Sequence, residues 1–283
     1  MATFYNQATL SYNGTSTTSN IVSGEIRSSL SVTKTAVSGS YSAGGNVTYV
    51  ISIVNADATA FTGLTLTDDL GAYTLGGNTL YPLTYVDGSL LYYVNGVLQT
   101  APTVGTEEPL VITGITVPAN GNATIIYNAN VNEYADPSTG ATIVNTVTLS
   151  GAGIADTTAE ETVTAGSTVD LTISKSLSPT SVVENGNITY TFLIQNSGNT
   201  AADASQDIVL TDTFDPILSD ITVTLNGVTL DEGTDYTYDE TTGEFATVSG
   251  VITVPAATFT QDETTGIWTI TPGTVVLTVN GTI

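Results

Sequence analysis

The sequence predicts an all-β protein built from two tandem immunoglobulin-like β-sandwiches, and three observations support that fold class. Short runs of β-branched and aromatic residues alternate with polar residues, turn signals separate these runs, and one strand pattern occurs twice. With 283 residues, 41% of them hydrophobic, the chain has enough apolar material for two cores. We expect the first sandwich over residues 27–150, a linker over 151–167 and the second sandwich over 168–283.

The two copies of the pattern correspond strand by strand. Each opens with a strand that ends in a lysine, Lys34 or Lys175, and 15 residues later each has the tyrosine of a Gly-Asn-x-Thr-Tyr segment. A later strand ends in Thr-Asp, at Asp68 or Asp212. Both copies then contain an Asn-Gly pair that suits a tight type I′ turn, and an Ile-Thr-Val-Pro-Ala segment. This repetition predicts two domains of the same fold.

The two copies differ in their last strand. The first copy continues into a strand at 141–149, whereas no such strand follows the second copy. The counterpart lies at 2–10, which matches 141–149 position by position and shares its Ala, Thr, Asn, Thr and Leu residues. We therefore expect residues 1–26 to form an N-terminal arm whose donor strand, residues 2–10, completes a second sandwich.

The donor strand can be used in different ways. Given to a neighbouring subunit, it makes a head-to-tail contact, and such contacts grow filaments unless the rotation closes a ring. Alternatively, the strand could fold back and complete the second sandwich of its own chain. This is disfavoured, because residues 2–10 are connected to the start of the first sandwich and the vacant place lies in the other domain. A third interpretation makes residues 1–26 the tail of an upstream repeat. We expect donation, with the chain itself as partner in a homopolymer and an unknown anchor or tip subunit.

Strand parity places polar residues on the apolar faces of these strands. Alternate residues of a strand point to opposite faces, so Lys34 shares its face with Leu30 and Val32. The same argument places Lys34, Asp68 and Asn145 in the first core, and Lys175, Asp212 and the donated Asn6 in the second. The residues of the donor strand expected to point inward are Ala2, Phe4, Asn6, Ala8 and Leu10.

Buried charges need partners, because an uncompensated ammonium or carboxylate costs several kcal/mol. One interpretation is a buried Lys–Asp ion pair with the Asn amide hydrogen-bonded beside it. The other is an isopeptide bond: burial lowers the lysine pKa, the neutral amine attacks the Asn side-chain carbonyl, a protonated Asp polarises that carbonyl, and ammonia leaves. The pattern resembles the Lys–Asp/Glu–Asn sites of immunoglobulin-like domains in Gram-positive pilins and adhesins.

At the family level, these motifs resemble the bacterial surface repeats known as domain of unknown function 11. The resemblance covers nearly the whole chain, once fully and once with the last strand transposed. It implies a structural subunit of an extracellular fibre or pilus-like appendage. Neither a sorting motif nor a membrane anchor is seen, and residues 1–6 lack the basic start and apolar stretch of a secretion signal. We therefore expect a free-standing appendage on the bacterial cell or spore surface.

Composition argues against most other functions. The chain has 27 acidic and 3 basic residues, a formal charge of −24, and no histidine or cysteine. Without these two residues it has no His-dependent nucleophile and no imidazole or thiolate metal site, so we expect no enzyme, no metal and no cofactor. The negative charge disfavours nucleic acids and anionic membranes as partners. We expect acidic turns such as 231–235 to be solvated hairpin tips rather than calcium sites.

The main alternative function is a surface adhesin or another carbohydrate- or protein-binding module. Its platform would be the aromatic cluster of Tyr81, Tyr85, Tyr92 and Tyr93, or Trp268. Aromatic side chains in strands are more often core residues or cross-strand pairs. A glycoside hydrolase is the remote third option, because no distinctive carboxylate pair stands out.

Overall fold

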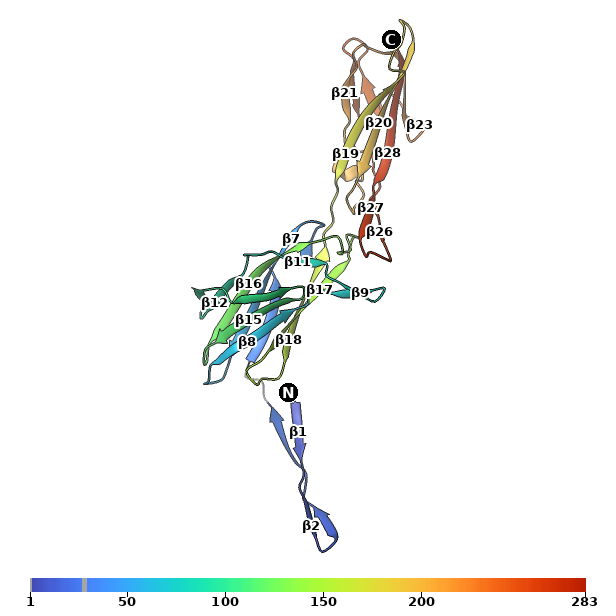
Figure 1. The fold of residues 1–283 in the computed structure, drawn as a ribbon. Coiled ribbons are helices and arrows are strands. Elements are labelled where there is room, and N and C mark those ends of the chain that lie inside the picture. Colours follow the sequence, from blue (N-terminus) through green and yellow to red (C-terminus); the bar gives the residue numbers. More distant parts are fainter. Residues whose placement is uncertain (1, 27–29) are drawn as a thin grey trace. The chain divides into compact units, whose positions relative to one another are not determined.

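The computed structural model describes residues 2–26 and 30–283, and its elements are strands apart from one short 3-10 turn, η1 (Ala204–Gln206). The chain divides into two compact units (Figure 1). The first unit comprises Met1–Asn132 and Ile143–Val163, and the second comprises Glu133–Thr142 and Thr164–Ile283. The all-β fold class predicted from the alternating pattern is confirmed.

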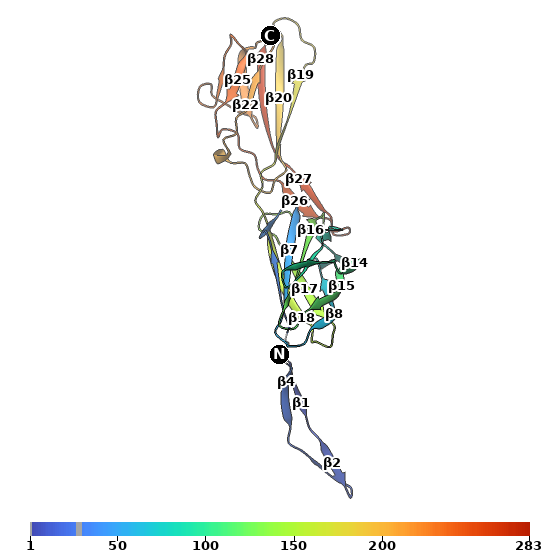
Figure 2. The same ribbon diagram turned by 90° about the vertical axis from the view of Figure 1, so that its left-hand side faces the viewer.

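Residues 2–26 form a β-hairpin, which we call the arm (Figure 2). Strand β1 (Ala2–Asn6) pairs with β4 (Val22–Ile26), and β2 (Thr9–Tyr12) pairs with β3 (Thr15–Thr18). The turn is Asn13-Gly14, whose positive φ angles of 46° and 77° suit these two residue types. All side chains from residue 4 to residue 23 are exposed. The predicted donor strand is thus β1 and the start of β2.

The first unit packs two large sheets against each other. One has the order β13-β12-β16-β7-β5, with β11 also on β16. Its strands are β5 (Leu30–Ala36), β7 (Asn46–Asn55), β11 (Leu83–Tyr85), β12 (Leu91–Val94), β13 (Val97–Gln99) and β16 (Asn122–Val131). Burial alternates along β7 and β16, so Tyr49 and Tyr127, which are partners in the register, both face the core.

The opposing sheet has the order β14-β15-β8-β17-β18-β6. Its strands are β6 (Ser40–Tyr41), β8 (Phe61–Asp68), β14 (Thr103–Glu107), β15 (Leu110–Val117), β17 (Thr142–Ser150) and β18 (Thr157–Ala165). A small hairpin, β9 (Tyr73–Leu75) and β10 (Asn78–Leu80), lies outside both sheets. Strand β8 is an inner strand of this sheet, because β15 and β17 pair with its two edges.

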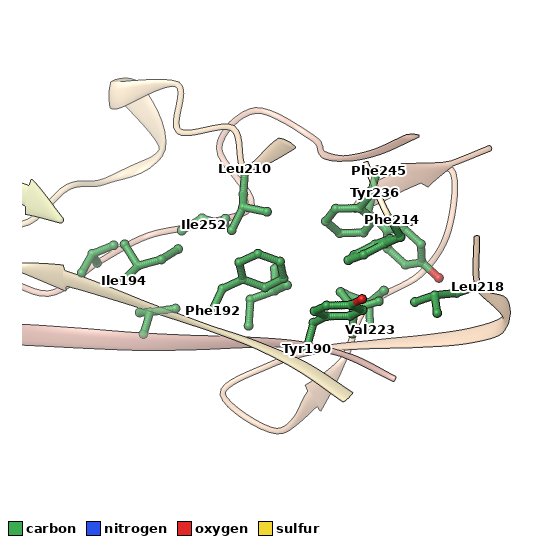
Figure 3. Packing of buried hydrophobic residues seen from close by; sticks show 14 of the residues in the cluster. Tyr190, Phe192, Ile194, Leu210, Phe214, Leu218, Val223, Tyr236, Phe245 and Ile252 are labelled. Carbon is green, nitrogen blue, oxygen red and sulfur yellow. The ribbon is translucent and has the colours of Figure 1, made fainter. Parts of the chain in front are cut away.

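The second unit repeats this plan with a smaller second sheet. One sheet comprises β19 (Leu171–Ser178), β20 (Asn187–Asn196), β28 (Gly273–Thr282), β22 (Ser219–Leu225) and β23 (Val228–Thr229), in that order. The other comprises β21 (Thr211–Thr213), β25 (Glu244–Thr247) and β24 (Tyr236–Tyr238), and a hairpin joins β26 (Thr258–Gln261) to β27 (Trp268–Thr271). Aromatic rings fill much of the core: Phe214 packs on Tyr190 and Phe245 at centroid distances of 4.9 and 5.8 Å (Figure 3).

Matching asparagines explain part of the repeated sequence. Buried Asn55, at the end of β7, donates through Nδ2 to the carbonyls of Thr59 and Pro118. Asn196, at the end of β20, donates in the same way to Thr200 and Pro255. Both prolines belong to the repeated Ile-Thr-Val-Pro-Ala segment. Each asparagine therefore ties a strand end to a neighbouring loop and satisfies buried carbonyls.

The stretch 151–167, predicted as a linker, needs correction. It contains β18, which pairs with β17 and β6 in the first unit, and Val163 and Ala165 of this strand are buried. Threonines and glutamates make the stretch look like a connection, because only one face of the strand is covered. The hairpin of β17 and β18 is therefore part of the first fold.

Candidate functional site

In the first unit, three of the residues predicted to point inward lie in the core. Lys34 is on β5, Asp68 ends β8, and Asn145 is on β17. Each follows the alternation of its strand, so each shares a face with apolar neighbours, and all three are buried. The fold thus places an amine, a carboxylate and a carboxamide between its two sheets.

Lys34 and Asp68 are in direct contact. Lys34 Nζ lies 2.6 Å from Asp68 Oδ2, and neither side chain is exposed. The carboxylate has further donors: the Tyr127 hydroxyl donates to Oδ2 at 2.6 Å, and the Leu70 amide donates to Oδ1 at 3.0 Å. The lysine amine also lies over the Tyr49 ring, 4.7 Å from its centroid. These contacts offset the burial of the charges.

Asn145 joins this group through Tyr127. Its Nδ2 donates to the Tyr127 hydroxyl at 3.3 Å, so the hydroxyl links the asparagine to Asp68. The Asn145 Oδ1 atom and the Tyr49 hydroxyl are buried and meet no hydrogen-bond partner among residues 2–26 and 30–283. Buried polar atoms without a protein partner are rare, so these two atoms distinguish the site from the rest of this core.

Tyr127 is the site residue that the sequence interpretation missed. The signal for it was the alternation of β16, which turns Ala123, Ile125, Tyr127 and Ala129 toward the core. A tyrosine among such residues suggests packing alone, and only the three-dimensional position of its hydroxyl between Asp68 and Asn145 assigns it to the site.

Burial makes the Lys34 amine easier to deprotonate. Burial lowers the pKa of Lys34 from 10.5, although the negative charges of Asp68, Asp69 and Glu161 oppose the shift. Burial also raises the pKa of Tyr49 and of Tyr127, so both hydroxyls keep their protons. The site therefore combines a lysine of lowered pKa with a carboxylate and a phenol that can transfer protons.

The second unit repeats the Lys–Asp pair in an open setting. Lys175 on β19 contacts the carboxylate of Asp212 on β21, but 40% of the lysine side chain and 18% of the aspartate side chain are exposed. Three aromatic rings surround the amine, those of Tyr190, Phe192 and Phe214, at 4.5, 5.4 and 5.3 Å from their centroids. Val279 takes the place of Tyr127, since β28 follows β16 at a constant offset of 152, so this site has no matching phenol.

The open setting has a topological cause. Strand β8 has neighbours on both edges, whereas β21 is the edge strand of its sheet. The face of β19 that matches the buried face of β5 is exposed: Leu171 by 36%, Ile173 by 58% and Leu177 by 41%. In the first unit, β17 lies beside Asp68, whose partner there is Val147. The second unit therefore presents an unpaired strand edge beside an apolar face that contains Lys175 and Asp212.

The arm carries the remaining residues predicted to point inward. Phe4 is 52% and Leu10 is 64% exposed, and Asn6 and Ala8 are exposed too. Phe4 stands opposite Gly24, and Asn6 stands opposite Val22. The backbone of Ala2 pairs with Ile26, while the side chain of Ala2 lies outside the described part of the structure.

The residues of the alternative binding interpretation are partly structural. Tyr85 and Tyr92 are buried, and the Tyr92 hydroxyl donates to the Thr116 carbonyl at 2.6 Å. Tyr81, Tyr93 and Trp268 are half-buried.

In the acidic turns, Asp239 and Asp262 accept hydrogen bonds from backbone amides within their own loops, and these bonds lower the pKa of both carboxyls. Within the described ranges, no helix has the length and apolarity to cross a membrane.

Comparison with solved structures shows likeness to Gram-positive pilins and adhesins at low identity. The major pilin subunit BcpA of Bacillus cereus is 13% identical, with a TM-score of 0.36 over 96% of this chain and 73% of that one. The pilus backbone RrgB of Streptococcus pneumoniae is 13% identical, with a TM-score of 0.34 over 87% and 55%. A Staphylococcus aureus collagen-binding domain is 12% identical, with a TM-score of 0.31 over 50% and 99%. Enzymes are also among the similar structures.

No family model and no curated protein matches the sequence. The resemblance to the repeats of domain of unknown function 11 therefore rests on the motifs themselves. The function is therefore inferred from the two Lys–Asp sites and the strands around them.

Proposed function

We propose that the chain is a structural subunit of a self-assembling extracellular fibre, in which the arm of one subunit completes the second unit of the next. The observation that carries this proposal is the difference between two equivalent strands. Strand β8 is enclosed by β17, whereas β21 is an edge strand beside an exposed apolar face. An unpaired edge of this kind is a template for another strand, and a donated strand would cover both this edge and the apolar face beside it.

The first unit provides the register of the added strand. There Val147 is opposite Asp68, Thr148 is opposite Thr67, and Leu149 is opposite Leu66. Since residues 2–10 match 141–149, the equivalent partners in the fibre are Ala8 with Asp212, Thr9 with Thr211 and Leu10 with Leu210. In this register Asn6 would hold the position that Asn145 has in the first unit, where the Tyr127 hydroxyl links the asparagine to Asp68.

The added strand also covers the exposed apolar surface. Phe4 and Leu10 each contribute roughly 1.5 to 3 kcal/mol if they become fully buried against β19 and the aromatic core. Residues 2–24 contain no charged side chain and Glu25 is the one charged residue of the arm, so the arm adds little repulsion when it approaches a chain of net charge −24. An apolar, uncharged donor strand fits the open face of a second copy of this chain.

The same geometry supports covalent locking. In each reaction the lysine Nζ forms a bond to the asparagine Cγ, the Cγ–Nδ2 bond breaks, and the Nδ2 group leaves as ammonia with protons supplied by the lysine through the aspartate. Lys34 and Asn145 would react within one chain, with Asp68 as proton relay. Lys175 would react with Asn6 of the neighbour, with Asp212 as relay. The lowered pKa of Lys34 favours the required neutral amine.

The fibre would be a pilus-like appendage on a bacterial cell or spore surface, with an anchor or tip subunit of unknown identity. The motif resemblance to bacterial surface repeats supports this location. The chemistry proposed is autocatalytic and single-turnover, so the chain would not be an enzyme in the ordinary sense, and no cofactor or metal takes part.

The test combines imaging with a cross-link. Purified chain at neutral pH should form long filaments by negative-stain electron microscopy, and deletion of residues 1–10 should abolish them. Because the sequence has no cysteine, Thr9→Cys with Thr211→Cys should give a ladder of disulfide-linked multimers. The control pair, Thr9→Cys with Thr213→Cys, is out of register and should give little cross-linking.

Other outcomes would overturn the proposal. An intrachain disulfide in the Thr9→Cys, Thr211→Cys protein would mean that the arm folds back into its own second unit. Discrete particles that bind glycans or matrix proteins with or without residues 1–10 would favour the adhesin.

A further inference from the structure

We infer that the donated element is the complete hairpin of residues 2–26 and not the single strand 2–10. In this arrangement β3 and β4 take the place beside the donor strand that β18 holds in the first unit. The inference rests on the proposed function and specifies its interface, because the partner is again a second copy of this chain. Two strands, rather than one, would be added to the β21 edge.

The arm and the β17–β18 hairpin have the same length and begin at the same pair of positions. Residues 2–26 match 141–165 at a constant offset of 139, without insertion or deletion. In the arm, Ala2 and Ile26 are partners. At the equivalent positions, the Ala165 amide donates to the Ala141 carbonyl at 2.7 Å. Two antiparallel hairpins that begin at the same pair of positions and have the same number of residues can occupy the same place in a sheet.

One cross-strand pair has a large and a missing side chain in the arm, where the first unit has two side chains of medium size. Ile143 and Val163 are both buried in the first unit, and their arm equivalents are Phe4 and Gly24. These two face each other across the hairpin, and a Cβ added to Gly24 would lie 2.5 Å from the Phe4 ring. The larger residue of the arm pair therefore lies over the position with no side chain. This complementarity is expected if both residues face one packed core together.

The second strand of the hairpin is more apolar in the arm than in the first unit. Strand β18 carries Glu160 and Glu161, and Glu161 is close enough to Lys34 to oppose the loss of its proton. At these positions the arm has Ile21 and Val22, which are 61% and 55% exposed. Ile21 immediately precedes β4 and Val22 is its first residue, and no other part of the arm covers these two side chains. Docking of the hairpin beside the second core would cover Val22.

The second unit also has a segment to receive the outer strand. In the first unit β18 pairs with β6, the Ser40–Tyr41 segment. At the offset of 141 that relates β5 to β19, its equivalent is residues 181–182, next to Val183, which is 79% exposed. The hairpin would thus lie between β21 on one side and residues 181–183 on the other, which closes the sheet as β6 does in the first unit.

The experiment is a substitution cycle at the Phe4–Gly24 pair. Gly24→Val places a side chain against the Phe4 ring, which can swing into solvent in a free arm but not within a packed core. The critical concentration for fibre formation should therefore rise at least about tenfold. Phe4→Ile with Gly24→Val restores the pair found in the first unit and should return the critical concentration to within about threefold of the original. The matched control is Gly39→Val, at a surface position where an added Cβ meets nothing within 4 Å.

The outcomes separate this inference from the proposed function. If fibres form, need residues 1–10, and are unaffected by Gly24→Val, then the single strand is donated and the hairpin inference is wrong. If no fibres form, or fibres do not need residues 1–10, the proposed function itself fails. Hydrogen exchange on unsubstituted fibres gives an independent readout: amides of residues 181–183 should become protected on assembly, and unchanged exchange there would also overturn the hairpin.

Discussion

Val32 and Ile173 occupy the same position in the two repeats, yet Val32 is 9% exposed and Ile173 is 58% exposed. Both lie two residues before the lysine of their first strand and face the same side as that lysine. The sequence pattern of the two strands is alike, so the difference comes from the opposite sheet. In the first unit β17 and β18 extend the opposite sheet beyond β8, whereas β21 is an edge strand with no such neighbours.

Substitution at these two positions should separate assembly from folding. Ile173→Glu should change the unfolding free energy of the isolated subunit by no more than about 0.5 kcal/mol, because the side chain is exposed, but should prevent fibre formation. Val32→Glu buries an unpaired carboxylate and should destabilise the first unit by several kcal/mol. Thermal unfolding and negative-stain imaging measure the two effects. Normal fibres from the Ile173→Glu protein would contradict the proposed interface.

The mass of the purified chain tests the first isopeptide bond. Each bond releases one ammonia, so the unsubstituted chain should be about 17 Da lighter than its sequence mass per bond formed. Asn145→Ala should restore the full mass, because it removes the carbonyl that Lys34 attacks. Asn128→Ala is the control, since Asn128 accepts a hydrogen bond from Thr48 and lies outside the site. A subunit of full sequence mass would mean that Lys34 and Asp68 form only an ion pair.

The stability of the first unit and the rate of bond formation should both depend on pH through Lys34. Burial lowers the pKa of Lys34 below 10.5, so between the two values the unfolded chain binds more protons than the folded one. In the Asn145→Ala protein, where the amine stays free, the stability of the first unit should therefore rise with pH in the lower part of this range. Burial raises the pKa of Tyr49 and Tyr127 above 10.0, so near pH 10 the unfolded chain loses tyrosine protons that the folded chain keeps, and the rise should stop there. Bond formation in refolding chain should also become faster with pH, which mass spectrometry at timed intervals can follow. A rate that falls as pH rises would contradict the neutral-amine mechanism.

Alternation along the strands was sufficient to predict which faces of β5, β8 and β17 carry Lys34, Asp68 and Asn145. It works there because these strands are covered on one face and show a clear period of two. Comparison of the two repeats also predicted that the second unit lacks a strand, and β21 is an edge strand there, while the assignment of residues 2–10 to that place stays a prediction. These inferences need only pattern and order along the chain.

The same reasoning failed where the pattern is weak or where function depends on distance. Strand β18 is threonine-rich with two glutamates, so its sequence resembles a connection, and its partnership with β17 is decided by the sheet. The match between the arm and the full β17–β18 hairpin was missed because identical residues become rare after Leu10 and Leu149. Tyr127 was missed because a period of two shows that it is buried but not what its hydroxyl touches.

Tyr127 provides a further prediction, because the second site has valine in its place. Tyr127→Phe removes the hydroxyl that donates to Asp68 and accepts from Asn145. The loss of a buried hydrogen bond to a charged group should cost roughly 1.5 to 3 kcal/mol of stability and should slow the Lys34–Asn145 reaction. It should not abolish that reaction, since Lys175 and Asp212 are proposed to react without a phenol. Timed mass measurements on both proteins distinguish slowing from loss, and an unchanged rate would show that Tyr127 is only structural.

Salt should accelerate assembly, because every subunit that joins the fibre carries a charge of −24. Repulsion between exposed charges is screened beyond about 8 Å at 0.15 M ionic strength, whereas burial of Phe4 and Leu10 does not depend on charge. Raising sodium chloride from about 0.02 to about 0.5 M should therefore speed elongation, measured by light scattering on preformed fibre fragments. Neutralising the exposed turn with Asp231→Asn and Glu232→Gln should speed elongation at low salt and reduce the salt effect. If elongation instead slows as salt rises, attraction between charges must hold the subunits together, and the donor strand of residues 2–10, which has no charged side chain, cannot be the main contact.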